Sequence, residues 1–410
     1  CQLRMCRWYN KRSEVLIMFE TAKRMKDFHL SIFTELLDEK KEYEFRTGRQ
    51  VLDFSLGSPD IAPSSRIIDV MEEAVKDPKN FRYAVTMLPA MRTAIQEWYK
   101  ERYDVQLEED EIVLLQGSQE ALVNLPLIYC NPNDGILVPN PYYPVYVDAP
   151  RLAQADILFM PLKAENDFLI DLDAVPEEDC QKAKMMIVCY PNNPTGAVAP
   201  DWFVEKLIAF ARKNNILVVY DNAYSDLNFK NPRSRSFLSY PGAKEAGVEI
   251  NSFSKSYGMA GARLGVLLGN REVVSAYEDL KSNMDYGVFL PVQYAGMEAL
   301  KTGSSLLKET RDTYKHRQDL LIDLFEKAGW KLNPSEGTMF LWAPVPAGYS
   351  SASAFAKDLL RKTGVMVTPG NAFGSAGEGF VRIALVQPDA VIEEAGSRLQ
   401  EAEFFQKQTR

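Results

Sequence analysis

The 410-residue sequence contains only two histidines, His29 and His316, and this shortage excludes several kinds of chemistry. A zinc site of the HExxH type, or a histidine-rich metal cluster, needs a histidine arrangement that the chain lacks. A Ser-His-Asp triad would have to recruit one of the two histidines, and neither lies near a GxSxG turn. His316 stands in the charged stretch 314–317, where a solvated helix face is the simplest interpretation. We therefore expect no metal site and no catalytic histidine.

The sequence also has few cysteines, fewer basic than acidic residues, and no long apolar run. The cysteines are Cys1, Cys6, Cys130, Cys180 and Cys189. Their number is odd and their spacing matches neither a CxxC motif nor a zinc finger, so we expect reduced thiols and a cytoplasmic location. The net charge of −9 argues against a nucleic-acid partner, because binding phosphates needs a basic surface. No apolar run reaches the ~18–20 residues that cross a bilayer, so no membrane partner is expected.

The overall composition is typical of a folded protein, with 46% apolar and 25% charged residues. Short apolar runs alternate with helical patterns up to about residue 290. These runs lie at 112–115, 136–138, 157–160, 185–189 and 216–219. Continuous apolar strands separated by helices predict an α/β fold with a mostly parallel sheet flanked by helices.

The pattern changes after about residue 290, where a long helical segment at 306–328 precedes a mixture of short strands and helices. This mixture predicts a smaller α+β domain. We therefore expect an N-terminal arm at 1–50 that is part of the small domain, a large domain at 51–290 and a small C-terminal domain at 291–410.

Polar residues follow several predicted strands, at the edge where parallel sheets usually bind ligands. Residues 116–120 open a helix, and its free amides favour an anion such as phosphate, although a capped helix start explains them equally well. The turn at 190–196 contains Asn193 and could be only a turn. Asp221 follows the next strand and could be a turn cap. Lys255 follows the run 248–253, and a lone loop lysine is usually a surface charge.

These turns are more specific together than any one of them is alone. They supply a lysine (Lys255), a carboxylate (Asp221), an amide (Asn193) and a phenol (Tyr224). Phosphate donors are also present at Ser118, Ser252, Ser254 and Arg263. This inventory matches a phosphorylated pyridine aldehyde, since the lysine can form an imine and the carboxylate can keep the ring nitrogen protonated.

The motifs and their order resemble the class I/II aminotransferases of fold type I, from about residue 54 to 399. The residues that carry the resemblance are the YPNNPTG segment at 190–196, Asp221, Tyr224, the SFSK segment at 252–255 and the GARLG segment at 261–265. The resemblance implies that pyridoxal 5'-phosphate is the cofactor, bound mainly by the large domain. It implies that Lys255 is the Schiff-base lysine and the catalytic base, and that Asp221 pairs with the pyridine nitrogen.

The same resemblance assigns the rest of the site. Asn193 and Tyr224 would contact the ring hydroxyl, and Tyr143 would stack on the ring. The phosphate and its turn would be held by Ser118, Gln119, Ser252, Ser254 and Arg263. Tyr83 would reach the phosphate of the partner subunit, which implies a homodimer with shared active sites.

The substrate-binding residues of the family correspond to Gly57, Asn193 and Arg382. Arg382 would bind the α-carboxylate of the substrate, because a planar guanidinium can donate two parallel hydrogen bonds to a carboxylate. Its other interpretation is a surface arginine on a strand.

The implied reaction moves an amino group between an L-amino acid and a 2-oxo acid. Segments 54–60, 162–176 and 281–289 look most like LL-diaminopimelate aminotransferases, which makes LL-diaminopimelate and 2-oxoglutarate a candidate pair. Residues 84–89 lack the glycines of that branch, and Gln119 stands where it often has lysine. The stretch 282–292 lacks the arginine that is common in the aspartate branch.

Two alternatives remain open at this point. A pyridoxal-phosphate-dependent C–S lyase would share every cofactor contact and differ in the group that leaves the substrate. A ligand-sensing regulator with an aminotransferase-like domain would need a DNA-binding module, and the fifty residues before Val51 show no helix-turn-helix pattern.

Overall fold

The larger part of the molecule is built on a seven-stranded sheet with the order β2-β8-β7-β6-β5-β3-β4. The computed structural model describes residues 19–28 and 31–405. The strands of this sheet are β2 (Ile112–Leu115), β3 (Gly135–Asn140), β4 (Asp156–Pro161), β5 (Ala183–Cys189), β6 (Leu217–Asp221), β7 (Gly247–Ser252) and β8 (Gly265–Gly269). Only β8 runs against its neighbours, pairing antiparallel with both β2 and β7. The expected mostly parallel sheet is confirmed.

Helices cover both faces of this sheet, which is why its strands are continuously apolar. In β2, Ile112 and Leu114 pack into the core on one face, while Val113 and Leu115 pack into the core on the other. The helices around the sheet are α3 (Pro89–Tyr103), α4 (Ser118–Tyr129), α5 (Val145–Ala153), α6 (Glu177–Lys182), α7 (Asp201–Asn214), α8 (Ala243–Ala246), α9 (Phe253–Ser256) and α10 (Arg271–Ser282). Each fully buried aliphatic side chain contributes about 1.5–3 kcal/mol to this core.

The smaller part combines two short sheets with helices, as the mixed pattern predicts. Its antiparallel sheet has the order β11-β12-β9, and β1 pairs in parallel with β10. The strands are β1 (Leu52–Asp53), β9 (Phe340–Pro344), β10 (Val365–Met366), β11 (Thr368–Pro369) and β12 (Phe380–Ala384). The helices are α1 (Ser31–Thr47), α12 (Ala352–Thr363) and α13 (Asp389–Glu401). The proposed division into three domains stays a prediction.

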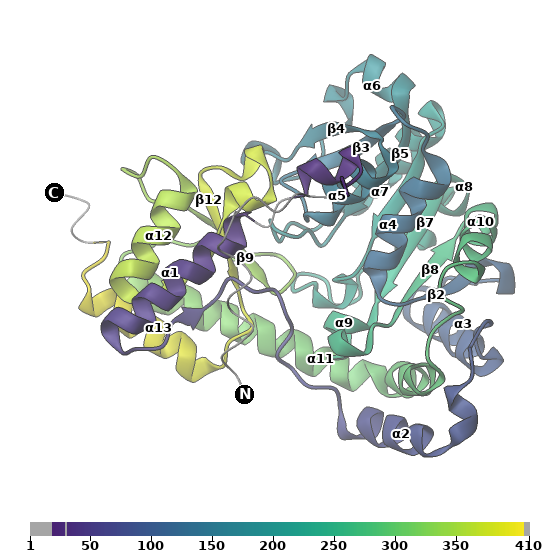
Figure 1. Cartoon of the computed structure of the whole chain (residues 1–410), viewed down its shortest axis with the longest axis horizontal. Coiled ribbons are helices and arrows are strands. Elements are labelled where there is room, and N and C mark those ends of the chain that lie inside the picture. The colour runs from purple at the N-terminus through teal and green to yellow at the C-terminus, as the bar shows by residue number, and fades with distance from the viewer. Residues whose placement is uncertain (1–18, 29–30, 406–410) are drawn as a thin grey trace.

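One long helix, α11 (Leu290–Lys327), connects the two parts. Figure 1 shows it running along the molecule from α2 (Ser65–Lys76) to α13, and it packs against α2, α3 and α13. The helical segment expected at 306–328 is therefore the second half of a longer helix that begins directly before a proline at its first turn.

Two local features differ from the sequence pattern. Asp201 stands directly before the helical pattern at 202–213 and is a plausible N-cap for it, but in the structure Pro200 occupies the cap position of α7, and the Asp201 carboxylate accepts a hydrogen bond from the Tyr240 hydroxyl at 2.6 Å. Strand β8 was not expected, because its apolar run is only three residues long, between Gly265 and Gly269. His29, Cys1 and Cys6 lie outside the described residues. Among the helices that are described, none is long and apolar enough to span a membrane.

Candidate active site

A cavity of about 270 Å³ lies at the carboxyl ends of β2, β5, β6 and β7. This is the edge of a parallel sheet where ligands usually bind. The cavity is lined by Gly57, Ser118, Gln119, Tyr143, Tyr146, Asn193, Asp221, Ala223, Tyr224, Ser254, Lys255, Arg263, Phe340 and Arg382. The structure thus brings together all of the expected site residues except Ser252 and Tyr83.

Asp221 is the last residue of β6 and is 4% exposed. One carboxylate oxygen, Oδ1, accepts a hydrogen bond from the backbone N–H of Ala223 at 3.2 Å, so Asp221 does cap the turn. The other oxygen, Oδ2, accepts a hydrogen bond from the Tyr146 hydroxyl at 2.6 Å. Burial raises the pKa of Asp221, and these two hydrogen bonds together with Lys255 oppose that rise. A cationic group in the cavity would stabilise the charged form further.

Lys255 lies on the short helix α9 and lines the same cavity as Asp221. Burial lowers the pKa of Lys255, Asp221 opposes this shift, and Arg263 adds to it. Its Nζ atom lies 5.9 Å from the centre of the Tyr224 ring. Lys255 is therefore not a solvated surface charge. A lowered pKa increases the fraction of neutral amine, which is the form that acts as nucleophile and base.

One end of the cavity has the features of an anion site. Ser118 begins α4, so the free backbone N–H groups of the first turn lie at the cavity. Gly117 precedes it with φ of +84°, and a Cβ atom there would lie 2.3 Å from the Arg263 guanidinium. Glycine is required because the guanidinium occupies that space. Ser254 also faces the cavity, while Ser252 accepts a hydrogen bond from the Ser254 N–H at 3.2 Å and caps α9.

Arg382 on β12 is 6% exposed, which excludes the surface interpretation. Its guanidinium lies between the rings of Phe340 and Phe373, at 4.3 and 4.5 Å from their centres. It donates hydrogen bonds to the Ser55 carbonyl at 2.9 Å and to Oδ1 of Asn193 at 3.1 Å.

The charge of Arg382 is not balanced by any carboxylate among the described residues. Its Nε atom is buried without a hydrogen-bond partner. Burial lowers the pKa of Arg382 to about 10, so the group remains protonated at neutral pH. A buried cation with a free donor calls for an anionic ligand, because an unpaired buried charge is costly.

The remaining expected residues complete the walls. The Asn193 amide donates a hydrogen bond to the Tyr224 hydroxyl at 3.4 Å. The Tyr143 hydroxyl donates to Oε1 of Gln119 at 3.3 Å. Gly57 lies against Phe340, and a Cβ atom on it would come within 2.8 Å of the ring.

Three lining residues, Tyr146, Ala223 and Phe340, were not predicted from the sequence. Tyr146 lies on α5, and its position three residues after Tyr143 was the available signal. Phe340 lies on β9, where the apolar run at 339–343 predicts a strand, but nothing in the local pattern indicated the face to which it points. Tyr83, in contrast, is 82% exposed and does not reach this cavity; its ring packs against Tyr286 with the ring centres 5.2 Å apart.

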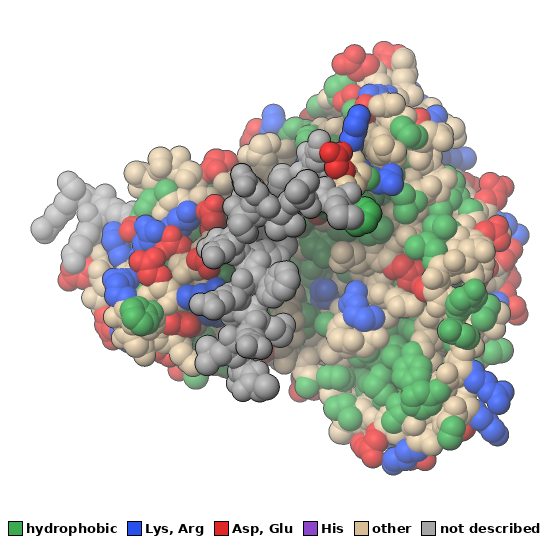
Figure 2. All heavy atoms as spheres, viewed as in Figure 1, with side chains coloured by type: hydrophobic (Ala, Val, Ile, Leu, Met, Phe, Trp, Pro, Cys, Tyr) green, Lys and Arg blue, Asp and Glu red, His purple; other side chains and the backbone are tan. Residues whose placement is uncertain are grey.

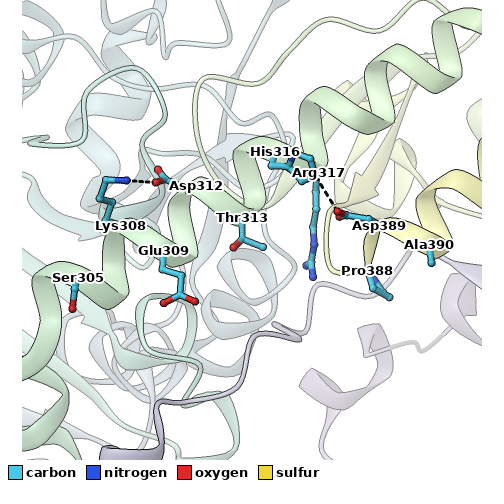
Figure 3. A pocket seen from close by; sticks show the side chains of 10 residues that line it. All are labelled: Ser305, Lys308, Glu309, Asp312, Thr313, His316, Arg317, Pro388, Asp389 and Ala390. Carbon is cyan, nitrogen blue, oxygen red and sulfur yellow. Dashed lines mark hydrogen bonds and ion pairs between the residues drawn. The ribbon is translucent and has the colours of Figure 1, made fainter.

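His316 lies in a different place, a shallow hollow of about 870 Å³ along α11 (Figure 3). Its Nε2 atom is 2.9 Å from a carboxylate oxygen of Asp389, and the side chain is 61% exposed. Beside it, Arg317 makes two hydrogen bonds of 2.8 Å to Asp60 and so fixes the segment that carries Gly57. The described residues contain no group of histidine, cysteine and acidic side chains that could hold a metal ion.

Comparisons with known proteins identify the family. Residues 49–399 match the family described as Aminotransferase class I and II. The LL-diaminopimelate aminotransferase of Moorella thermoacetica is 42% identical over 383 residues, which cover 93% of this chain and 97% of the relative.

Solved structures agree with this assignment. Substrate-bound BacF from Bacillus subtilis is 34% identical with a TM-score of 0.89, over 94% of this chain and 98% of the other. A probable N-succinyldiaminopimelate aminotransferase from Thermus thermophilus is 36% identical with a TM-score of 0.85, over 91% and 100%. The chain therefore belongs to the class I and II aminotransferases, a family of transaminases that depend on pyridoxal phosphate. The expected family, fold, enzyme class and cofactor are confirmed.

The cavity fits this cofactor. The Gly117–Arg263 contact and the start of α4 suit the phosphate, and the buried carboxylate of Asp221 suits a protonated ring nitrogen. Lys255 lines the same space and supplies the amine.

Proposed function

We propose that this transaminase works as a homodimer and transfers an amino group from LL-diaminopimelate to 2-oxoglutarate. The names of relatives about 40% identical over most of the chain support LL-diaminopimelate as the amino donor, as does the segment 281–289. The observation that carries the reaction type is the position of Arg382. Its buried, unbalanced guanidinium shares one cavity with the Lys255 amine, so an amino acid held by its carboxylate would present its α-carbon to that amine.

In this proposal each residue has a separate task. Arg382 and Asn193 bind the α-carboxylate of the substrate. Bound pyridoxal phosphate supplies the aldehyde and the electron-withdrawing ring. Lys255, with its lowered pKa, takes the proton from the substrate α-carbon through Nζ. Asp221 stays charged opposite the ring nitrogen, and Tyr224 with Asn193 orients the ring hydroxyl.

Tyr146 has a supporting task in this scheme. Its hydroxyl donates to Oδ2 of Asp221 at 2.6 Å and so stabilises the charged form of that carboxylate. Tyr143 would cover the ring, and Ser118, Gln119, Ser252, Ser254 and Arg263 would hold the phosphate and its turn.

The homodimer is supported by an exposed apolar surface, which we call the aromatic patch. It consists of Phe81, Tyr83, Val85, Met284, Tyr286 and Phe289, which are between 42% and 82% exposed. Figure 2 shows apolar side chains gathered over the first turns of α11, next to this patch in the chain. Large exposed apolar patches mark interaction sites. With this patch buried in a dimer, Tyr83 would reach the phosphate in the partner subunit.

A cytoplasmic location is supported by the use of cysteine. Cys130, Cys180 and Cys189 are all unpaired. Burial raises the pKa of Cys130 to about 11, so its thiol stays protonated and unreactive at neutral pH.

The substrate is tested with purified enzyme loaded with pyridoxal phosphate. LL-diaminopimelate and 2-oxoglutarate should yield glutamate with a higher kcat/KM than other amino donors paired with the same acceptor. A donor that is clearly preferred over LL-diaminopimelate would overturn the substrate assignment. Release of pyruvate and ammonia from a cysteine conjugate, without glutamate formation, would instead indicate the C–S lyase. The Lys255→Ala variant is the matched control, because it should lose the imine absorption and turnover together.

A further inference from the structure

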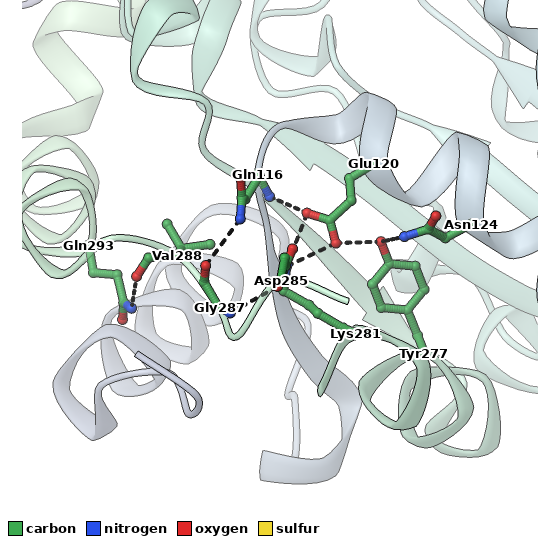
Figure 4. A network of polar contacts seen from close by, with 9 residues as sticks. All are labelled: Gln116, Glu120, Asn124, Tyr277, Lys281, Asp285, Gly287, Val288 and Gln293. Atoms are coloured by element: carbon green, nitrogen blue, oxygen red, sulfur yellow. Dashed lines mark hydrogen bonds and ion pairs between the residues drawn. The ribbon is translucent and has the colours of Figure 1, made fainter. Parts of the chain in front are cut away.

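A group of buried and half-buried charged side chains lies at the start of α4, the helix whose first residue, Ser118, lines the cavity (Figure 4). Lys281 on α10 is at its centre, with Nζ 2.9 and 3.0 Å from the two carboxylate oxygens of Glu120. Nζ also lies 2.6 Å from Oδ2 of Asp285. The three side chains are 8%, 14% and 24% exposed, respectively. We call these residues the Lys281 cluster.

One side of the Lys281 cluster holds the turn that precedes α4. Glu120 lies in the first turn of this helix, and its Oε2 atom accepts a hydrogen bond from the backbone N–H of Gln116 at 2.5 Å. Its Oε1 atom accepts another from the Tyr277 hydroxyl at 2.7 Å. Gln116 is followed by Gly117 and Ser118, so these contacts fix the start of the helix that faces the anion site.

The other side holds the loop that follows α10. Oδ1 of Asp285 accepts a hydrogen bond from the Gly287 N–H at 2.8 Å, and the Gln116 side chain donates to the Gly287 carbonyl at 3.2 Å. Gly287 has φ of +98°, and a Cβ atom there would lie 1.8 Å from the Ala84 carbonyl. The loop is therefore tightly packed on the segment that carries Tyr83.

This loop supplies part of the aromatic patch. The Tyr286 ring packs on the Tyr83 ring with 5.2 Å between centres, and the Phe289 ring packs on the Phe81 ring with 5.4 Å between centres. The Lys281 cluster thus contacts the phosphate turn on one side and the backbone of the patch on the other.

We propose that Lys281 is a positioning residue that joins the cofactor-phosphate turn and the aromatic patch into one unit, so that phosphate binding and subunit association strengthen each other. The inference rests on the proposed homodimer. Removing Lys281 would leave the half-buried carboxylates of Glu120 and Asp285 without their shared cation, and their repulsion would separate the turn from the loop. Coupling between two binding sites requires an element that both ligands bias, and this unit is such an element.

The test measures subunit exchange between two fluorescently labelled samples of the cofactor-free protein, with and without saturating inorganic phosphate. In the wild type, phosphate should slow exchange by about tenfold, the size of a typical coupling between sites. In Lys281→Met the phosphate effect should fall below about twofold. The double variant Glu120→Gln/Lys281→Met removes the cation together with one of its two carboxylates, so the remaining Asp285 has no nearby like charge in the cluster; it should lose the effect as well while keeping a folded protein.

Lys308→Met is the matched control, because Lys308 forms an exposed ion pair with Asp312 on α11. It should retain the full phosphate effect. The inference would be overturned if phosphate did not change the rate of subunit exchange in the wild type, or if it slowed exchange in Lys281→Met as much as in the wild type. Failure of the proposed function would look different, since a protein without a dimer in sedimentation or without imine absorption would refute that proposal independently.

Discussion

Asp221 illustrates how the burial of one charged side chain lowers the folding stability of the cofactor-free protein. Burial raises its pKa above the ordinary 3.8, so the folded cofactor-free protein takes up a proton at a higher pH than the unfolded chain does. The loss of folding stability caused by this buried charge is absent below pH 3.8. It grows as the pH rises from there to the pKa of the folded state, and it is complete above that pKa.

Asp221→Asn should therefore raise the melting temperature of the cofactor-free protein at neutral pH, with a gain that shrinks as the pH falls toward 3.8. The same change should lower kcat by about 100-fold or more, because the ring nitrogen loses its anionic partner. Thermal scans across pH, paired with turnover measurements, check both effects. A variant that is less stable than the wild type at neutral pH would contradict this account.

Tyr146→Phe is expected to lower the folding stability of the cofactor-free protein. It keeps the Asp221 charge but removes the 2.6 Å hydrogen bond, which is worth about 1.5–3 kcal/mol for a charged acceptor. The cofactor-free protein should be destabilised at neutral pH and much less so when Asp221 is protonated. Denaturant unfolding at two pH values distinguishes these cases, and an equal loss at both would argue against a charge-dependent role.

Arg382→Lys should raise KM for the amino acid by about 100-fold, because an ammonium cannot donate two parallel hydrogen bonds or lie flat between two rings. Steady-state kinetics with the amino donor and with the oxo acid should show the same loss, since both carry the bound carboxylate. Arg271→Lys serves as the control on a side chain that is 60% exposed. An unchanged KM in Arg382→Lys would contradict the proposal that Arg382 binds the substrate carboxylate.

Much of this site could be predicted residue by residue, since Lys255, Asp221 and Arg382 stand in motifs with a fixed order. Tyr146 and Phe340 could not be predicted in the same way. Their roles come from the direction in which α5 and β9 present them, and that direction depends on packing between elements that are distant in the chain.

Among the elements, the strands of the large sheet followed from the sequence because both of their faces are buried and their residues are uniformly apolar. Strand β8 was not predicted because three apolar residues between two glycines give little local signal. Strand β1 carries almost none, since it has two residues and pairs with β10, a segment far away in the sequence.

The segment after β1 provides a prediction at this scale. Gly57→Ala would place a Cβ atom 2.8 Å from the Phe340 ring, which itself lies 4.3 Å from the Arg382 guanidinium. The ring would have to move and Arg382 with it, so KM should rise by roughly tenfold while thermal stability falls only slightly. Kinetics and melting curves measured on the same preparation test this; a wild-type KM would show that the ring can move without disturbing the guanidinium.

At the scale of the whole molecule, the proposed dimer with shared sites makes a prediction about mixtures. In a hybrid of Lys255→Ala and Tyr83→Ala subunits, one site carries both changes and the other carries neither. Co-expressed hybrids should therefore recover about half of the wild-type activity, although each homodimer is impaired. Turnover of the purified hybrid is the measurement. Activity no higher than the average of the two parents would mean that Tyr83 does not cross between subunits.

The pairing of Leu52 with Val365 also has a consequence for biosynthesis. During translation the large sheet can assemble as soon as β8 has left the ribosome, because its partners have all been made by then. Strand β1, which is synthesised before every one of them, must wait as an unpaired segment until β10 has emerged as well. The earliest strand among the described residues is thus among the last to find its neighbour.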